Sequence, residues 1–358
     1  MLERYGHGGD LLTAAELFGH SPDLFLDYSS NMNPMGPPTC VQRIFSERWM
    51  EVVRYPDPAT RVLRKKIAAY YRIPEESILV GNGAAELIDL VVRITQPATV
   101  AVTAPSFVEY SDNALRVGAS LHYIPLKAEH SFDVQAEDLS HALYKADLTM
   151  LGHPNNPTGR LIPDVLMDML QTAKGTVMLD EAFIDFLENE EQVSMIQRAP
   201  SMKKLIVIRS MTKFFAIPGI RLGFVVAHPD IILQMRNLQV HWSVNHFSQL
   251  IGAAALDDAQ YISDTKKRVS TERQWFYEQL SSIGLDVIQS AVNYLLVRLP
   301  KQVPFHVPEM QEKLGQMKIL IRDASRFPGL DERYFRLAVR LREDNETVAR
   351  ALKHIIQP

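Results

Sequence analysis

The stretch from Leu205 to Phe224 reads LIVIRSMTKFFAIPGIRLGF. Its first four residues form a continuous apolar run, which is typical of a strand buried on both faces. The run ends in a polar step that carries Lys213, and a second apolar run extends from Leu222 to Ala227. The stretch therefore predicts two strands joined by a loop, with a lysine placed where the first strand of a sheet ends.

The loop brings together a serine and two cations, Ser210, Lys213 and Arg221. A lysine beside apolar groups and another cation is disfavoured as an ammonium ion, so it forms a Schiff base readily. Arg221 and Ser210 can bind a phosphate. Together these groups indicate pyridoxal phosphate held covalently by Lys213. The alternative is that Lys213 is a surface lysine in a basic loop.

The composition of the chain is that of an ordinary globular protein. It has 358 residues, 46% of them hydrophobic and 22% charged, enough for more than one domain. A formal net charge of -4 provides no positive field for nucleic acid or a membrane surface. The single cysteine, Cys40, cannot form an internal disulfide, and the first ten residues lack the apolar core of a secretion signal. We expect a cytoplasmic protein that binds neither nucleic acid nor membranes.

Between residues 40 and 240, apolar runs alternate with helical patterns, and polar or small residues follow the end of each run. In a mostly parallel sheet these ends meet at one edge, where α/β folds bind ligands. We therefore expect an α/β fold with five loops facing one site. Besides the Lys213 loop, these are Gly81-Asn82-Gly83, Ala104 to Phe107, Gly152 to Gly159, and Asp180 to Phe183.

The sequence GNGAAE at 81–86 opens a predicted helix that extends to about Arg93. The unpaired N-H groups at a helix N-terminus suit a phosphate, and small Ala84 and Ala85 let it approach. The alternative is a dinucleotide fingerprint, which requires glycine at the position that Glu86 occupies. A phosphate cradle that includes Gly83 is therefore the preferred interpretation.

Three further residues suit a flat, charged ring. Asp180 closes an apolar strand, where a carboxylate is unfavourable unless it meets a cation such as a pyridinium nitrogen. Asn156 can hydrogen-bond a ring hydroxyl, and Phe107 can stack on the ring. The alternatives are a helix-capping Asp180, a turn-forming Asn156 and a core Phe107.

Both ends of the chain carry candidate anion-binding groups. Residues 1–39 predict turns and extended segments, and Gly8 and Gly9 allow the His7 segment to wrap an anion with its backbone N-H groups. Near the C-terminus, Phe335 to Arg340 alternates as a strand. Arg336 and Arg340 then flank Ala338 on one face, where a ligand with two negative groups would fit. The alternatives are a flexible N-terminus and a solvated edge strand.

An ordered set of motifs resembles one family. GNGAAE, PNNPTG, DEAF, SMTK with Arg221 eight residues on, and RYPDP at 54–58 are similar to fold-type I pyridoxal-phosphate enzymes of the histidinol-phosphate aminotransferase branch. HGGD, SSNMNP and ILIRDASRFPGLDERYFRLAVR narrow the resemblance to the threonine-phosphate decarboxylases of cobalamin synthesis. The resemblance implies an N-terminal segment (1–39), a large cofactor-binding domain (40–260) and a small C-terminal domain (261–358).

The resemblance also implies roles for individual residues. Lys213 would hold the cofactor, and Asp180, Asn156 and Phe107 would contact its ring. Tyr55 would reach the cofactor phosphate of a second subunit, so the family pattern implies a homodimer with shared active sites. The groups implied around the cofactor phosphate are Gly83, Ala84, Ala85, Ser210, Thr212 and Arg221. Those implied around a phosphorylated amino-acid substrate are His7, Gly8, Gly9, Asn31, Arg322, Arg336 and Arg340.

The implied activity is decarboxylation of L-threonine O-3-phosphate to (R)-1-amino-2-propanol O-2-phosphate. The alternatives are a histidinol-phosphate aminotransferase and a cofactor-binding regulator without turnover; the chain has no spare length for the DNA-binding domain that such a regulator usually carries. One departure from the family pattern puts transamination in doubt. Where aminotransferases of this branch usually have tyrosine in DEAY, this chain has Phe183, which removes a donor to the ring oxygen.

Overall fold

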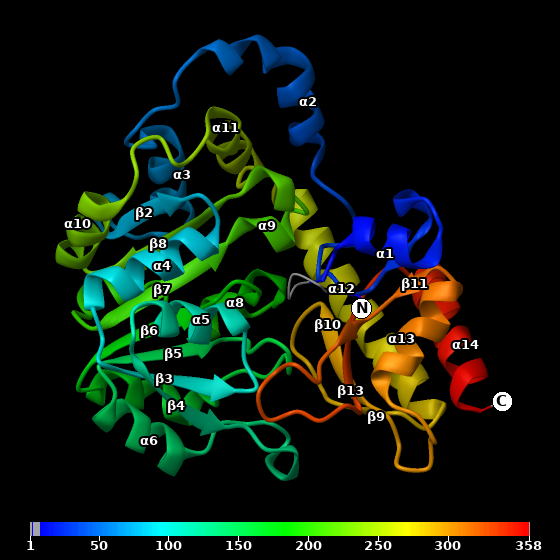
Figure 1. Cartoon of the computed structure of the whole chain (residues 1–358). Coiled ribbons are helices and arrows are strands. Elements are labelled where there is room, and N and C mark those ends of the chain that lie inside the picture. The colour runs from blue at the N-terminus through cyan, green and yellow to red at the C-terminus, as the bar shows by residue number, and fades with distance from the viewer. Residues whose placement is uncertain (1, 3–7, 358) are drawn as a thin grey trace.

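A seven-stranded sheet lies at the centre of the larger part of the computed structural model, which describes residues 2 and 8–357 (Figure 1). The strand order is β2-β8-β7-β6-β5-β3-β4, and every strand except β8 runs in the same direction. The carboxyl ends of six strands therefore meet at one edge. The strands are β2 (Ile78–Gly81), β3 (Thr99–Ala104), β4 (Ser120–Pro125), β5 (Leu148–Gly152), β6 (Thr176–Asp180), β7 (Leu205–Ser210) and β8 (Gly223–Ala227).

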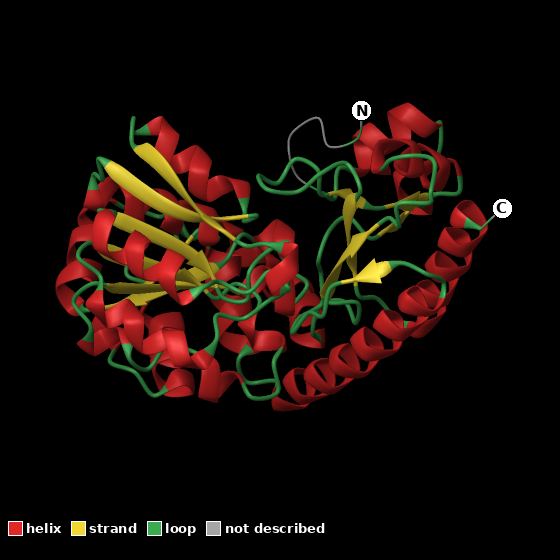
Figure 2. Ribbon diagram, turned by 90° about the horizontal axis from the view of Figure 1, so that it is seen from below, coloured by secondary structure: helices red, strands yellow, loops and turns green. Residues whose placement is uncertain are grey.

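Helices cover both faces of this sheet (Figure 2), which explains why its central strands read as unbroken apolar runs. In β7, Ile206 and Ile208 join the core on one face, while Leu205 and Val207 join the core on the other. The first core includes α4 (Ala84–Thr95), α5 (Val108–Arg116) and α10 (Pro229–Leu238). The second includes α2 (Thr39–Arg48), α3 (Arg61–Tyr71), α6 (Ala136–Lys145) and α11 (His246–Ala255).

A smaller antiparallel sheet, in the order β12-β13-β10-β9, has a core of its own. This core includes Phe335 and Leu337 of β13, together with Phe276 of the long helix α12. The second core of the large sheet, which includes α2, α3, α6 and α11, also contains Val269 of α12, so this helix contributes to both parts of the molecule. The elements are α12 (Ala259–Ser282), β9 (Asp286–Val287), β10 (Tyr294–Arg298), α13 (Val307–Gln316), β12 (Arg322–Asp323), β13 (Tyr334–Ala338) and α14 (Arg342–Ile356).

The N-terminal segment packs on the smaller part of the molecule. Helix α1 (Leu11–Phe18) begins at Asp10, whose side chain accepts a hydrogen bond from the Thr13 backbone at 3.0 Å. Strand β1 (Leu26–Asp27) then pairs in parallel with β11 (Ile319–Leu320). The prediction of turns and extended segments is therefore wrong over α1, because Asp10 caps and stabilises a helix there.

The predicted α/β fold with a mostly parallel sheet is confirmed. The division at residue 260 stays a prediction, and α12 begins one residue before it, at Ala259. Over the described residues, no helix combines the length and the apolar character that crossing a membrane requires. The short helices are α7 (Asp164–Met167), α8 (Glu190–Val193) and α9 (Met211–Phe214).

Candidate active site

Two adjoining cavities lie where the predicted loops meet at the edge of the large sheet. The inner cavity is about 110 Å³ and the outer one about 360 Å³, and Lys213, Asn156 and Phe107 line both. The structure thus brings together residues that follow different strands, as the sequence predicted. The inner cavity is lined by Ala84, Ala85, Phe107, Tyr110, Pro154, Asn156, Asp180, Ala182, Phe183, Ser210, Thr212, Lys213 and Arg221.

Lys213 lies in the short helix α9, which follows β7 directly. Its Nζ donates a hydrogen bond of 3.1 Å to the Thr212 hydroxyl, which itself lies 2.8 Å from the hydroxyl of Ser210. The pKa of Lys213 is lowered to about 8, mainly by burial; the charge of Asp180 opposes this shift, and the charges of Arg221 and Arg336 add to it. About a tenth of Lys213 is therefore a neutral amine at pH 7, far more than for an ordinary lysine, and this is the form that attacks a carbonyl carbon.

Asp180 ends strand β6 with its carboxylate buried. The Tyr110 hydroxyl donates to Oδ2 at 2.6 Å, and the Ala182 backbone N-H donates to Oδ1 at 3.0 Å. Burial raises the pKa of Asp180, whereas both hydrogen bonds and the charge of Lys213 lower it. Sequence reasoning placed Asp180 here but missed Tyr110, which carries no signal beyond a tyrosine one helical turn after Phe107.

The N-terminus of α4 faces the inner cavity, as expected from GNGAAE, since Ala84 and Ala85 line it. Gly83 precedes the helix with a φ of 81°. A Cβ atom on Gly83 would lie 2.5 Å from a guanidinium nitrogen of Arg221. Only glycine accommodates both the positive φ and this close approach, which holds a cation against the end of the helix.

Asn156 connects the cavity to the smaller part of the molecule. Its Oδ1 accepts a hydrogen bond of 2.5 Å from Arg336, which also donates to the Ser29 carbonyl oxygen at 2.8 Å. Because Oδ1 binds Arg336, the Nδ2 group is the donor that Asn156 presents to a ligand. The Arg336 guanidinium lies 5.5 Å from the Tyr294 ring, whose edge meets the Phe183 ring at 4.9 Å.

The outer cavity contains several predicted substrate-binding residues, including Gly8, Asn31, Arg322 and Arg336. A Cβ on Gly8 would lie 2.3 Å from the Ser29 carbonyl oxygen, so the backbone passes too closely for any other residue. Oδ1 of the buried Asn31 finds no hydrogen-bond partner among the described residues. The remaining lining residues are Ser29, Ser30, Met32, Ala85, Phe107, Val108, Glu109, Asn156, Phe183, Lys213, Arg221 and Phe327.

Several predicted residues do not line either cavity, and one is not described. Arg340 follows strand β13 and its Nε binds Asp344 at 3.0 Å, so it does not line either cavity. Gly9 lies beside the outer cavity, where its N-H donates to the Ser29 hydroxyl at 2.8 Å. Tyr55 is 82% exposed on the surface. His7 lies outside the described residues.

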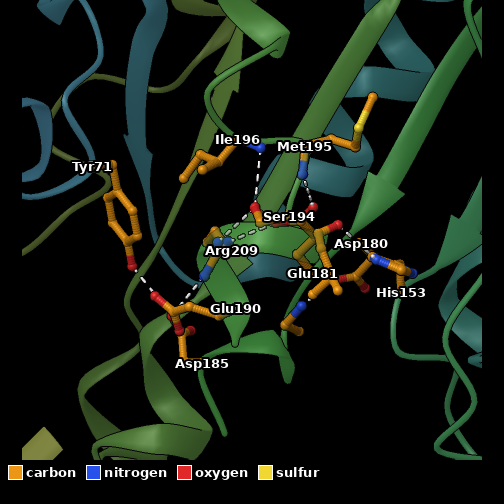
Figure 3. A network of polar contacts seen from close by, with 12 residues as sticks. Tyr71, His153, Asp180, Glu181, Asp185, Glu190, Ser194, Met195, Ile196 and Arg209 are labelled. Atoms are coloured by element: carbon orange, nitrogen blue, oxygen red, sulfur yellow. Dashed lines mark hydrogen bonds and ion pairs between the residues drawn. The ribbon is translucent and has the colours of Figure 1, made fainter. Parts of the chain in front are cut away.

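Behind the inner cavity lies a buried network that sequence reasoning missed (Figure 3). Arg209, which is 1% exposed, binds Glu181 at 2.9 Å, Asp185 at 2.6 Å and the Ser194 hydroxyl at 2.9 Å. Glu181 directly follows Asp180, and Arg209 directly precedes Ser210. The network therefore ties together the two strand ends that carry cavity residues. Its signal in the sequence is a charged residue, Arg209, at the end of an otherwise apolar run.

His153 lies close to this network and has only backbone partners (Figure 3). Its Nδ1 accepts from the Ile162 N-H at 3.1 Å, and its Nε2 lies 3.2 Å from the Val193 carbonyl oxygen. Burial lowers the pKa of His153, so the ring is neutral. These contacts give His153 a structural role.

The chemistry of the inner cavity fits pyridoxal phosphate. It offers a lysine with a lowered pKa, a buried carboxylate for a ring nitrogen and an amide donor for a ring oxygen. At its other end, Arg221, two hydroxyl groups and a helix N-terminus form a site for a phosphate. This donor set also disfavours the alternative that Lys213 is a surface lysine, since the residue lies within the cavity.

Several known proteins are similar to this chain over most of its length. A threonine-phosphate decarboxylase from Salmonella typhimurium is 34% identical over 98% of this chain and 96% of its own length. An adenosylcobalamin biosynthesis bifunctional protein from Leptospira interrogans is 31% identical over 98% of this chain, which covers 41% of that protein. A solved histidinol-phosphate aminotransferase from Clostridium acetobutylicum is 31% identical, with a TM-score of 0.85 over 92% of this chain and 98% of its own.

A further match gives the family, and a second solved structure shares the fold. The family described as Aminotransferase class I and II matches residues 26–355, which is most of the chain. A solved histidinol-phosphate aminotransferase from Sinorhizobium meliloti, in complex with pyridoxal 5'-phosphate, shares the fold at 19% identity, with a TM-score of 0.87 over 100% of this chain and 99% of its own. The protein belongs to the class I and II aminotransferase family, whose members depend on pyridoxal phosphate.

Proposed function

We propose that this protein decarboxylates L-threonine O-3-phosphate to (R)-1-amino-2-propanol O-2-phosphate and carbon dioxide, as a step of cobalamin biosynthesis. The observation that carries the proposal is the 34% identity, over 98% of the chain, to a threonine-phosphate decarboxylase. The match extends over 98% of the chain, so it includes the segments that form both the large sheet and the smaller part of the molecule.

The charges around the outer cavity support a substrate with two negative groups. Arg322 and Arg336 face one another across strands β12 and β13, and both line the cavity beside Lys213. A carboxylate and a phosphate together carry enough negative charge to match two guanidinium groups, and arginine binds both groups through paired hydrogen bonds. A phosphorylated amino acid therefore fits this cavity better than a neutral one.

The cofactor, when bound, withdraws electrons from the substrate bond that lies perpendicular to its ring. Lys213 would attach it, Asp180 would meet the ring nitrogen, Asn156 the ring oxygen and Phe107 the ring face. These roles are proposals that rest on the positions of the side chains around the inner cavity. The residues proposed for the cofactor phosphate are Gly83, Ala84, Ala85, Ser210, Thr212 and Arg221.

In this proposal, orientation decides which substrate bond breaks. Arg336 would hold the carboxylate, while Asn31, Arg322 and the Gly8-Gly9 backbone would hold the phosphate; His7 and Arg340 complete the proposed phosphate set. Anchoring both ends turns the carboxylate-bearing bond of the α-carbon perpendicular to the ring, so binding energy from the distant phosphate selects the reaction. Lys213, with its lowered pKa, would then hold the proton that replaces the carboxylate at the α-carbon.

The proposal is tested by ranking kcat/KM for four substrates. L-threonine O-3-phosphate should give the highest value, and L-serine O-phosphate measures the contribution of the methyl group. Unphosphorylated L-threonine should lose activity in kcat as well as in KM, because the phosphate anchors the reactive orientation. If histidinol phosphate with 2-oxoglutarate is instead the best substrate, the chain is a histidinol-phosphate aminotransferase.

We also propose a homodimer with shared active sites. The segment from Trp49 to Tyr55 carries five strongly exposed large apolar residues, Trp49, Met50, Val52, Val53 and Tyr55. Trp242, also exposed, extends this patch, since its ring centroid lies 5.2 Å from that of Tyr55. A monomer rarely leaves so many large apolar groups together in water, and aromatic residues are enriched in the centre of protein interfaces.

Mixing two inactive variants tests the sharing of active sites. Tyr55→Ala and Lys213→Ala should each be nearly inactive alone, but a mixed dimer contains one site with both native residues. After complete subunit exchange at equal concentrations, about a quarter of the native site number should return, because half of the dimers are hybrids with one intact site. Hybrids that form, as shown by native mass spectrometry, yet remain inactive would contradict the sharing of Tyr55.

A further inference from the structure

Helix α5 places two aromatic residues against the inner cavity one turn apart. Phe107 immediately precedes the helix, and Tyr110 lies in its first turn. Their rings meet edge to face with centroids 5.7 Å apart and an interplanar angle of 85°. Residues three apart on a helix lie on the same side, so one short element presents a ring face and a phenol hydroxyl to the same space.

The Tyr110 hydroxyl ends on the carboxylate of Asp180. The donor-acceptor distance of 2.6 Å is that of a hydrogen bond to a charged oxygen, and the Tyr110 side chain is buried. The Ala182 N-H donates to the other oxygen of Asp180. One donor on each oxygen fixes the rotation of the carboxyl group about its bond to Cβ, which neither donor achieves alone.

We propose that Tyr110 is a positioning residue that holds the Asp180 carboxylate ionised and aimed at the ring nitrogen of the cofactor. The inference rests on the proposed role of Asp180 toward pyridoxal phosphate, but it does not depend on which reaction the protein catalyses. Tyr110 thereby links the proposed contact of Asp180 with the ring nitrogen to the proposed contact of Phe107 with the ring face, because Phe107 lies at the start of the same helix.

The groups around Asp180 determine in which direction its pKa should move when the Tyr110 hydroxyl is removed. Burial raises the pKa of Asp180, and the adjacent Glu181 carboxylate raises it further. The Tyr110 hydroxyl, the Ala182 N-H and the Lys213 ammonium lower it. Removing the Tyr110 hydroxyl removes one of the groups that lower the pKa of Asp180, while burial still raises it. The pKa should therefore rise, and the carboxyl group should take up a proton at a higher pH.

The test measures the binding of pyridoxamine 5'-phosphate to apo-enzyme between pH 5 and 9, because this probe forms no covalent bond with Lys213. In Tyr110→Phe, which keeps the ring, the dissociation constant at pH 8 should rise about tenfold, the size expected for a hydrogen bond to a charged group. The loss of affinity on the acid side should also begin at a higher pH than in the native enzyme. Such a shift distinguishes positioning from a merely structural contribution.

Tyr28→Phe is the matched control, because Tyr28 is equally buried and its hydroxyl donates to Asn345 at 2.8 Å, away from both cavities. The acid limb of binding, which is the fall in pyridoxamine phosphate affinity as the pH is lowered, should be the same in Tyr28→Phe as in the native enzyme. Site-specific 3-fluorotyrosine at position 110 keeps the hydroxyl but makes it a stronger donor, so it should move the acid limb to lower pH. This replacement also serves if Tyr110→Phe does not fold.

Asp180→Asn completes the experiment, since its side chain no longer titrates. It should abolish the dependence of the acid limb on residue 110, and Tyr110→Phe added to Asp180→Asn should lower affinity no further. An unshifted acid limb in folded Tyr110→Phe and in the fluorotyrosine enzyme would overturn the inference. A uniform loss of affinity at every pH, accompanied by a lower Tm of the apo-enzyme, would also overturn it and assign Tyr110 to packing.

Discussion

Replacing Lys213 with alanine is expected to abolish both covalent attachment of the cofactor and turnover. Lys213 lies between the two cavities, and its lowered pKa suits it to attack a carbonyl and to hold a proton at the substrate. Loss of a positioned acid-base group alone lowers kcat by roughly 10²- to 10⁴-fold. Borohydride treatment of native enzyme should fix pyridoxyl phosphate to the chain, as detected by mass spectrometry of peptides that contain residue 213.

Lys203→Ala is the matched control for this experiment, because Lys203 lies in the same segment but is exposed at the opposite end of β7. It should retain activity and the reducible linkage. If borohydride still fixes the cofactor to Lys213→Ala at the native level, another amine holds the cofactor.

The second large effect is expected at Arg336. Lysine at this position keeps the positive charge but cannot hold Asn156, the Ser29 carbonyl oxygen and a substrate carboxylate at once. We expect kcat/KM for threonine phosphate to fall by about 10²-fold or more, since one contact to a buried charge contributes roughly 2–4 kcal/mol. Because Arg336 binds Asn156, which is proposed to contact the ring oxygen of the cofactor, Arg336→Lys should also shift the visible absorbance of bound cofactor.

Arg298→Lys provides the comparison for Arg336→Lys. Arg298 lies on the neighbouring strand β10, packs over the Tyr334 ring at 5.3 Å and binds Asp331, but lines neither cavity. It should leave kcat/KM and the absorbance spectrum near their native values. Equal losses in both variants would show that packing of the small sheet, rather than contact with substrate, causes the effect at Arg336.

The parts of the fold and site that follow from local pattern were predictable from the sequence. The apolar run at Leu205 to Ile208 lies within β7, and the strands parallel to it end at the same sheet edge because they share its direction. The positions of Lys213, Asp180 and Asn156 around one cavity follow from that geometry.

Contacts between distant side chains were not predictable in the same way. The hydrogen bond from Tyr110 to Asp180 joins residues seventy positions apart, and the Arg209 network joins strands β6 and β7 to α8 and its surroundings. Such pairs depend on the packing of whole elements rather than on periodicity. Arg340 shows that local pattern can also mislead. Strand alternation predicted that Arg340 lies on the same face as Arg336, but the strand ends at Ala338, and Arg340 binds Asp344 instead.

The most direct test is to quantify products from holoenzyme and L-threonine O-3-phosphate without any keto acid. Decarboxylation predicts one carbon dioxide and one 1-amino-2-propanol O-2-phosphate for each substrate consumed, through many turnovers, with the cofactor remaining in its pyridoxal form. In deuterium oxide, one deuterium should appear at the carbon that lost the carboxylate. Rapid conversion of the cofactor to pyridoxamine phosphate, with turnover that needs 2-oxoglutarate and releases no carbon dioxide, would contradict the decarboxylase assignment.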